Sequence, residues 1–185
     1  MDWRCKKKER AKSRRLRILY EILDWFRVIV TGFAMAFVIS NTLIANAQVP
    51  TGSMEDTIMP GSRIIINRLS YVSKEPSRGD IVSFYYPDDG KSVYLKRIIG
   101  LPGECVEGRA GKVYIDGMAL EEGYVKEALC SDFGPFLVPS GSYFMMGDNR
   151  NNSWDSRYWE QPYVDAKEII GRAEFEYYPG FKWLN

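Results

Sequence analysis

The stretch Val93-Tyr-Leu-Lys-Arg-Ile-Ile99 decides the fold class, because β-branched and aromatic residues at this density are typical of a β-strand. Side chains alternate along a strand, so Lys96 lies on one face and Arg97 on the other. The remaining side chains of both faces are apolar or aromatic. We therefore expect one of the two cations to point inward or to lie against an apolar surface.

Five further segments have the same strand-like composition, and turn signals such as Asp116-Gly117 and Pro179-Gly180 separate them. These segments are 63–67, 81–86, 112–115, 143–146 and 169–178. Strand patterns outnumber helical patterns after residue 50, and we find no internal repeat. We therefore expect a mainly β domain over residues 46–185.

The N-terminal part of the chain differs in charge from the rest. Residues 1–27 carry ten basic and four acidic residues, whereas residues 28–185 carry 15 basic and 20 acidic ones, so the net charge of +1 hides an asymmetry. No charged residue occurs from Val28 to Ile44, which is about the shortest length that can span a bilayer. We predict a transmembrane helix over residues 28–45, with the basic head 1–27 in the cytoplasm and the β domain outside.

Three alternatives for this N-terminal region stay open at the level of sequence. A buried helix of a soluble domain would leave the basic head unexplained. A cleavable signal peptide has a similar basic region, a short apolar core such as Val28 to Ile39, and a small-residue site such as Ala45-Asn-Ala47. A basic arm that binds nucleic acid is disfavoured because the apolar span follows directly.

The chain contains no histidine, which excludes a Ser-His-Asp triad, a Cys-His protease and any histidine-ligated metal site. The cysteines are Cys5, Cys105 and Cys130, too few for a four-cysteine zinc site and too widely spaced for a C-x-x-C redox motif. Proton transfer in an enzyme of this composition has to come from Lys, Asp, Glu, Tyr or a chain terminus. Cys105 and Cys130 could pair in an oxidising compartment.

A serine and a lysine are the strongest candidates for catalysis. Ser53 lies in Pro50-Thr-Gly-Ser-Met54, where Gly52 permits an unusual backbone conformation before the serine. Desolvation in an apolar strand disfavours the ammonium form of Lys96, so its pKa falls and the neutral amine can act as a base. Arg97 cannot do this because it stays charged. A serine in an ordinary turn and a surface lysine are the plainer alternatives for the two residues.

The densest polar cluster is Gly147-Asp-Asn-Arg-Asn-Asn-Ser-Trp-Asp-Ser-Arg157. A run of this kind is usually a solvated loop. Its charges alternate, however, so they can pair with one another, and its hydroxyl groups can orient a neighbouring base.

The apolar span and the four motifs that follow it along the chain resemble, in their order, those of the bacterial type I signal peptidases, or leader peptidases, in their small Gram-positive form. After the apolar span, the motifs are residues 50–54, 78–82, 94–103 and 146–157. The resemblance extends over residues 20–175. It implies a coiled antiparallel β-sheet domain, as in the self-cleaving repressors of the SOS response, preceded by one transmembrane helix. Glu55-Asp56 departs from the Glu-Pro that is common in the family.

The resemblance also assigns catalytic roles. It makes Ser53 the nucleophile and Lys96 the general base, with no metal and no cofactor. Ser153 corresponds to the serine that orients the lysine amine, and Thr51 to a hydroxyl of the oxyanion hole.

Two further sets of residues follow from the resemblance. An ion pair that braces the site corresponds to Asp155 and Arg157, with Asp148 and Arg150 in the same loop. Shallow pockets for small side chains are expected to be lined by Val49, Met54, Ile58, Tyr94 and Leu95.

The expected function is that of a membrane-anchored serine endopeptidase, which removes N-terminal signal peptides from exported preproteins after Ala-x-Ala sites. Its partners would be signal peptides and the lipid bilayer, with the secretion translocon nearby and no nucleic acid. A catalytically inactive membrane-bound binding module is the first alternative, and the intact Ser53, Lys96 and Ser153 disfavour it. An SOS-type repressor would need an N-terminal helix-turn-helix, and a sortase-like transpeptidase would need a histidine.

Overall fold

The computed structural model describes residues 3–184, and it describes side chains at Arg17 and from Leu19 onward, except those of Ser40 and Asn41. Most basic side chains of the predicted cytoplasmic head therefore lie outside the described residues. The chain divides into two units, Met1–Thr42 and Leu43–Asn185, each of which is described by itself.

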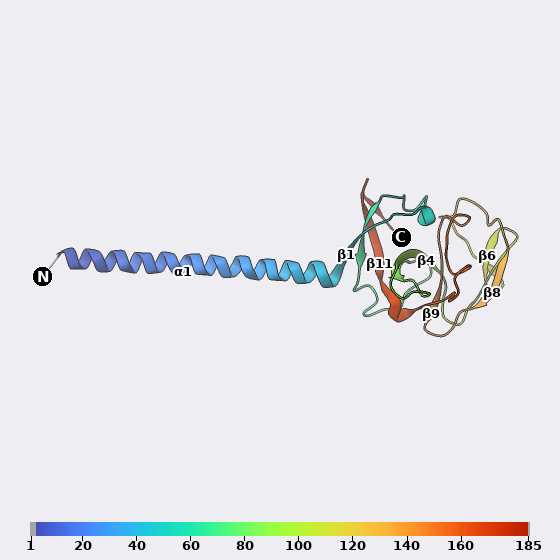
Figure 1. Cartoon of the computed structure of the whole chain (residues 1–185), viewed down its shortest axis with the longest axis horizontal. Coiled ribbons are helices and arrows are strands. Elements are labelled where there is room, and N and C mark those ends of the chain that lie inside the picture. Colours follow the sequence, from blue (N-terminus) through green and yellow to red (C-terminus); the bar gives the residue numbers. More distant parts are fainter. Residues whose placement is uncertain (1–2, 185) are drawn as a thin grey trace. The chain divides into compact units, whose positions relative to one another are not determined.

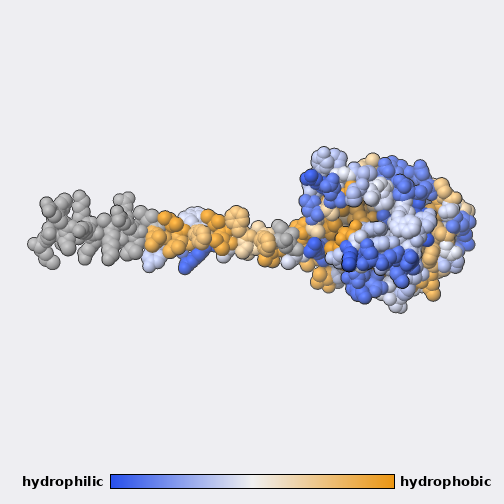
Figure 2. Space-filling model, viewed as in Figure 1, coloured by the Kyte–Doolittle hydropathy of each residue, from blue (hydrophilic) through white to orange (hydrophobic). Residues whose placement is uncertain are grey.

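The first unit is built around the helix α1 (Trp3–Val38), which continues into a π-helical turn, η1 (Ile39–Leu43) (Figure 1). Hydrophobic side chains along α1 are exposed, with Phe33, Met35 and Phe37 each about two-thirds to three-quarters accessible. Figure 2 shows that hydrophobic surface predominates along much of the part of this helix that it colours. No helix within the described residues is both long enough and apolar enough to cross a membrane.

The second unit contains two antiparallel sheets, and the larger one has the strand order β1-β2-β11-β3-β4-β9-β10, with β12 paired to β11. Figure 1 shows these strands curving around one end of the unit, with β6 and β8 of the smaller sheet at the other end. The larger sheet consists of β1 (Ile44–Gln48), β2 (Arg63–Asn67), β3 (Ile81–Tyr85), β4 (Val93–Gly100), β9 (Ser142–Met146), β10 (Val164–Asp165), β11 (Ile169–Tyr178) and β12 (Lys182–Trp183).

The smaller sheet has the order β7-β6-β5-β8. It consists of β5 (Cys105–Arg109), β6 (Lys112–Ile115), β7 (Met118–Ala119) and β8 (Phe133–Leu137). Two short 3₁₀ turns complete the unit: η2 (Gly52–Met54) and η3 (Ala166–Glu168). The mainly β, antiparallel fold predicted from the sequence is confirmed.

The hydrophobic core lies in three groups, of which the first and third matter most for the site. The first packs β1 and β2 against the segment that follows η2, through residues such as Met54, Ile58 and Ile64. The third joins the two sheets, with Ile99 and Phe144 of the larger sheet against Val106 and Val113 of the smaller one. The second surrounds Trp159 on β3, β4 and β9. These groups hold η2 and β4 in fixed positions.

The end of the predicted transmembrane segment differs from expectation. Ile44 and Ala45, placed at its C-terminal end, belong to β1, which pairs with β2 along all five of its residues. Ala45 and Ala47 pack against the first core group, so this segment gains backbone hydrogen bonds and apolar contacts as a strand. A cut after Ala47, as the signal-peptide alternative requires, would divide β1.

Candidate active site

Ser53 lies in the 3₁₀ turn η2, which begins four residues after the end of β1. The residue Thr51, just before the turn, has an extended backbone, and the turn closes when the amide of Glu55 donates to the carbonyl oxygen of Gly52 at 3.0 Å. Met54 and Ile58, on either side of the next turn, are fully buried. Packing of these two side chains in the core fixes the backbone of the turn, and this holds the Ser53 side chain in a defined position.

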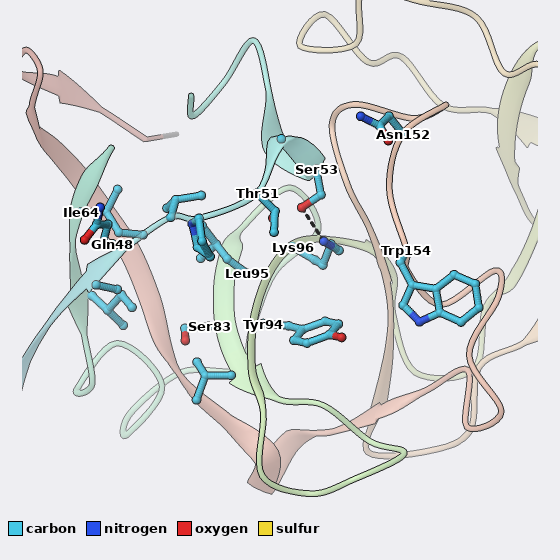
Figure 3. Close-up of a pocket in the computed structure, with 16 residues that line it drawn as sticks. Gln48, Thr51, Ser53, Ile64, Ser83, Tyr94, Leu95, Lys96, Asn152 and Trp154 are labelled. Atoms are coloured by element: carbon cyan, nitrogen blue, oxygen red, sulfur yellow. Dashed lines mark hydrogen bonds between the residues drawn. The ribbon is translucent and has the colours of Figure 1, made fainter. Parts of the chain in front are cut away.

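Lys96 reaches the serine from β4, 43 residues further along the chain. Its Nζ atom lies 2.6 Å from Ser53 Oγ, a hydrogen-bond distance, and Figure 3 shows the two side chains pointing at one another. Both side chains are buried: Ser53 is 9% and Lys96 4% exposed. A buried serine and a buried lysine in direct contact form a potential nucleophile–base pair.

Burial changes the protonation of Lys96. Desolvation lowers the pKa of its ammonium from 10.5 to about 8, and the nearby Arg157 acts in the same direction. The carboxylates of Asp155 and Asp148 oppose this effect, because their negative charges favour the ammonium. A substantial fraction of this lysine is therefore the neutral amine at mildly alkaline pH.

The sequence predicted that at least one of the two cations in β4 points inward, and both are buried, since Arg97 is 1% exposed. Its guanidinium binds the carboxylate of Asp148 through two hydrogen bonds, of 2.8 Å from Nε and 2.7 Å from Nη2. Thr57 donates a third hydrogen bond to Asp148, at 2.5 Å, and the Arg97 guanidinium lies 3.9 Å from the ring centre of Tyr124. This buried charge is thus fully paired.

The loop from Gly147 to Arg157 carries a second ion pair. Asp155 accepts hydrogen bonds from Arg157 at 2.8 and 2.9 Å and from the amide of Gly147 at 3.0 Å. The resemblance predicted the pairing of Asp155 with Arg157, and the geometry brings them together. Arg157 also donates to the carbonyl oxygen of Arg150, so the pair closes the two ends of the loop against one another.

Arg150, which the resemblance placed in the same loop as Asp148, pairs with a residue outside the loop. Its guanidinium forms two hydrogen bonds, of 2.6 and 2.5 Å, with Glu122 in the segment between β7 and β8. Asp148 pairs instead with Arg97. Neither Glu122 nor the partnership of Arg97 with Asp148 was predicted from the sequence. The position of Arg97 beside Lys96 in an apolar strand was the only feature of the sequence that pointed to a buried pair. Glu122 lies 28 residues from Arg150 in the chain, so no local pattern connected these two.

Ser153 is buried close to the turn that carries Ser53. Its Oγ atom has no hydrogen-bond partner among the described residues, although the side chain is only 8% exposed. Gly147 is the reason that it fits there, because a β carbon at residue 147 would overlap with Ser153 Oγ. A buried hydroxyl group without a partner is rare in a folded protein and is expected near a functional group.

A cavity of about 530 Å³ opens next to Ser53 and Lys96 (Figure 3). Three of the five predicted pocket residues line it, namely Val49, Tyr94 and Leu95. Met54 and Ile58 do not, because they face the core below η2. The other lining residues are Ala47, Gln48, Pro50, Thr51, Gly52, Ile64, Ile66, Ser83, Val93, Asn152 and Trp154.

Within the described part of the chain, no cluster of three or more acidic or cysteine side chains could hold a metal ion. Cys105 and Cys130 are free thiols, so they do not form the disulfide that the sequence left open.

The comparisons with known proteins agree with one another. A family model described as "Signal peptidase, peptidase S26" matches residues 22–178. The chain belongs to this signal peptidase family. It is 39% identical over 163 residues to a probable signal peptidase I-2 of Synechocystis sp., covering 85% of this chain and 73% of the relative. It is 37% identical over 180 residues to signal peptidase I S of Bacillus subtilis, covering 91% and 95% respectively.

Family membership establishes that the chain is a serine endopeptidase. The matched range includes every residue that lines the cavity. Among solved structures, a signal peptidase I from Enterococcus faecalis V583 is 38% identical, with a TM-score of 0.47. The aligned region covers 54% of this chain and 97% of the Enterococcus chain.

Proposed function

We propose that this peptidase removes N-terminal signal peptides from exported preproteins, with Ser53 as the nucleophile and Lys96 as the general base. The observation that carries the proposal is the 2.6 Å contact between Ser53 Oγ and Lys96 Nζ at the side of a cavity. In a chain without histidine, a lysine of lowered pKa is the available base for a serine.

The reaction starts from the neutral amine. As Ser53 Oγ attacks the carbonyl carbon of the scissile bond, its proton passes to Lys96 Nζ. The ammonium then gives this proton to the leaving amine of the mature protein, and the signal peptide remains bound as an ester of Ser53. Water attacks the ester, again with its proton accepted by Lys96. The ammonium returns this proton to Ser53 Oγ as the C–O bond breaks, so the signal peptide is freed and the neutral amine is restored.

Two further hydroxyl groups have roles in this proposal. Thr51 lines the cavity next to Ser53, where its hydroxyl can donate to the developing oxyanion together with the Ser53 backbone amide. Ser153, whose Oγ is buried without a partner among the described residues, supplies a hydrogen bond that orients the Lys96 amine during turnover.

The cavity suits an extended peptide that ends in small side chains. The strand β1 pairs only with β2 among the described strands, and β4 pairs with β9 only from Arg97 onward, so both strands have a free edge beside the cavity. A peptide can bind there through backbone hydrogen bonds. Aliphatic residues such as Ala47, Val49 and Leu95 leave shallow space between these edges. We infer cleavage after Ala-x-Ala sequences.

Membrane anchoring is the second part of the proposal. The uncharged stretch that begins at Val28 and ends before β1 would hold the chain in the bilayer, with the basic head 1–27 in the cytoplasm and the catalytic domain outside, near the translocon. The exposed apolar side chains of α1 support this, since such a surface is unfavourable in water. Anchoring would place the site where signal peptides reside.

The catalytic proposal is tested by incubating the detergent-purified full chain with a preprotein and sequencing the N-terminus of the product. We expect one cut after an Ala-x-Ala sequence, and no cut with the Ser53→Ala variant. A cut at unrelated positions, or cleavage by Ser53→Ala, would contradict the proposal.

The topology is tested separately on intact spheroplasts that express the chain. Protease added outside should degrade the β domain but leave an epitope attached before residue 1 protected. Release of the chain from membranes by alkaline carbonate, or protection of the β domain, would contradict the anchoring.

A further inference from the structure

Trp154 is a large aromatic residue exposed at the edge of the active-site cavity. It lines the cavity although 55% of its surface is accessible, and it directly follows Ser153 in the chain. Figure 3 shows that it lies on one side of Lys96, whereas Gln48 and Ile64 lie on the other. The pair of Ser53 and Lys96 therefore separates an aliphatic half of the cavity from an aromatic half.

Other aromatic residues hold the indole ring in place. Its Nε1 atom donates a hydrogen bond of 3.3 Å to the hydroxyl of Tyr86. Its ring stacks on that of Tyr158, with centroids 5.7 Å apart and planes 15° apart, and Tyr158 is itself 48% exposed. Tyr86 in turn stacks on Tyr94 at 4.5 Å, and Tyr94 also lines the cavity. The ring is therefore preorganised rather than free to rotate.

A fixed, exposed aromatic pair at the mouth of a catalytic cavity is a typical binding surface for an apolar group. The substrate direction identifies that group, and this step rests on the proposed function. If the aliphatic half takes the small residues before the scissile bond, the polypeptide leaves the dyad through the other half. The first two residues after the bond span about 7 Å in extended form, so they are the ones that remain close to the site.

We propose that Trp154, backed by Tyr158, is a specificity-determining residue that binds an aromatic side chain at the first or second position of the mature protein. Stacking on the indole ring would favour such preproteins over those with alanine there. Aromatic pairs of this kind change binding by about 3- to 10-fold.

The test uses one preprotein in three forms, with Ala at both positions after the cut, with Tyr at the first, and with Tyr at the second. For each protein variant, kcat/KM is measured on all three, and the Tyr/Ala ratio is the readout. We expect a ratio of about 3 to 10 in the wild type for one Tyr position, mainly through KM. Trp154→Ala should reduce this ratio to about 1, and Trp154→Phe should keep part of it. Trp183→Ala, which removes an equally exposed indole outside the cavity, should keep the wild-type ratio.

A wild-type ratio near 1 at both positions would overturn the inference while leaving the proposed function intact. So would a Trp154→Ala variant that loses activity equally on all three substrates, since the residue would then support the Ser153 loop and select nothing. Because a variant next to Ser153 can lose activity through a displaced loop, affinities for the uncleaved preproteins are also measured in a Ser53→Ala background. They should show the same Tyr/Ala ratio, and its absence there would contradict the inference. If the wild type cleaves none of the three preproteins, the proposed function itself fails, and the inference with it.

Discussion

Gly147 packs directly against the backbone carbonyl of Ser53, so closely that a β carbon on residue 147 would overlap with the Ser53 oxygen and with Ser153 Oγ. The backbone amide of Asn149 donates a hydrogen bond of 3.1 Å to the same carbonyl oxygen. The loop that carries Ser153 therefore packs directly on the turn that carries Ser53, and this packing requires that residue 147 has no side chain.

Gly147→Ala should consequently displace the loop from Ser53. We expect a loss of preprotein cleavage of about 100-fold or more, because misplacement by about 1 Å costs that much in a preorganised site. Gly123→Ala is the matched control, since a β carbon there meets nothing within 4 Å. Both variants are compared by cleavage rate and by circular dichroism. Full activity of Gly147→Ala would show that the close contact does not matter.

The second prediction concerns the pH dependence of cleavage. In the proposed mechanism the neutral amine of Lys96 is the active form. Its pKa is about 8, so kcat/KM should rise with pH through this value and then level off. Lys96→Arg keeps the charge but cannot release its proton, so it should be as inactive as Lys96→Ala at every pH. Cleavage by a folded Lys96→Arg variant would remove the Ser-Lys mechanism.

Stability gives an independent measurement of the same lysine. The pKa is about 8 in the folded chain and 10.5 in the unfolded one, so the unfolded chain binds more protons between these values and the folded state gains stability as pH rises. Below pH 8 Lys96 is mainly the buried ammonium, so the desolvation of this charge lowers the free energy of unfolding by its full amount. Lys96→Met should therefore raise the free energy of unfolding at pH 7 by about 2 to 3 kcal/mol, and the gain should shrink toward pH 10. Denaturant unfolding at several pH values measures this, with the exposed Lys91→Met as control. A gain that does not change with pH would contradict the assignment.

The fourth prediction concerns the buried pair of Arg97 and Asp148, whose side chains are 2% and 0% exposed. Asp148→Asn leaves the guanidinium unpaired in the core, so we expect a loss of about 3 to 5 kcal/mol in the free energy of unfolding. It also removes a negative charge that raises the pKa of Lys96. In this variant kcat/KM should therefore begin to rise at a lower pH than in the wild type.

The control for Asp148→Asn is Asp56→Asn, which breaks the exposed pair of Asp56 with Lys126. This change should cost less than about 1 kcal/mol. If both variants lost the same stability, burial would not be what makes the Arg97 pair important.

Ser153 is predicted to orient Lys96 and not to attack the substrate. Because its Oγ has no partner among the described residues, Ser153→Ala removes no hydrogen bond and should not lower stability. Turnover should nevertheless fall by about 10-fold or more, because the amine loses its orienting group. Mass spectrometry after reaction with a serine-directed acylating reagent should still find Ser53 modified. An unchanged turnover would show that the assigned role is wrong.

Much of the fold follows from local patterns. All six segments with strand composition form strands, and the bounds of β2, β6 and β11 agree with the prediction. The prediction missed β1, whose residues continue the apolar span, and β5 and β8, which contain Gly108 and Gly134-Pro135. A proline is tolerated in β8 because this strand lies at a sheet edge, and edges are a property of the sheet, not of the segment.

The candidate site was accessible from sequence where a residue type is chemically unusual for its place. The absence of histidine, a lysine in an apolar strand and a serine after glycine made Lys96 and Ser53 candidates, and the family resemblance then assigned their roles. The positions of Met54 and Ile58 were not accessible in this way. Both are apolar residues close to the nucleophile in the chain, and only the packing below η2 shows that they anchor the turn instead of lining the cavity.

The sequence alone determined the class of chemistry, because composition limits the available bases and a strand pattern sets which side chains alternate. The tertiary structure decided which charges are buried and with what partner. Alternation places Lys96 and Arg97 on opposite faces, but it cannot tell that both faces of β4 are covered, one by η2 and the other by the loop after β9. Ser53 and Asp148 come from segments 43 and 51 residues away. Burial and pairing depend on such long-range contacts, and these form only when the sheet closes around them.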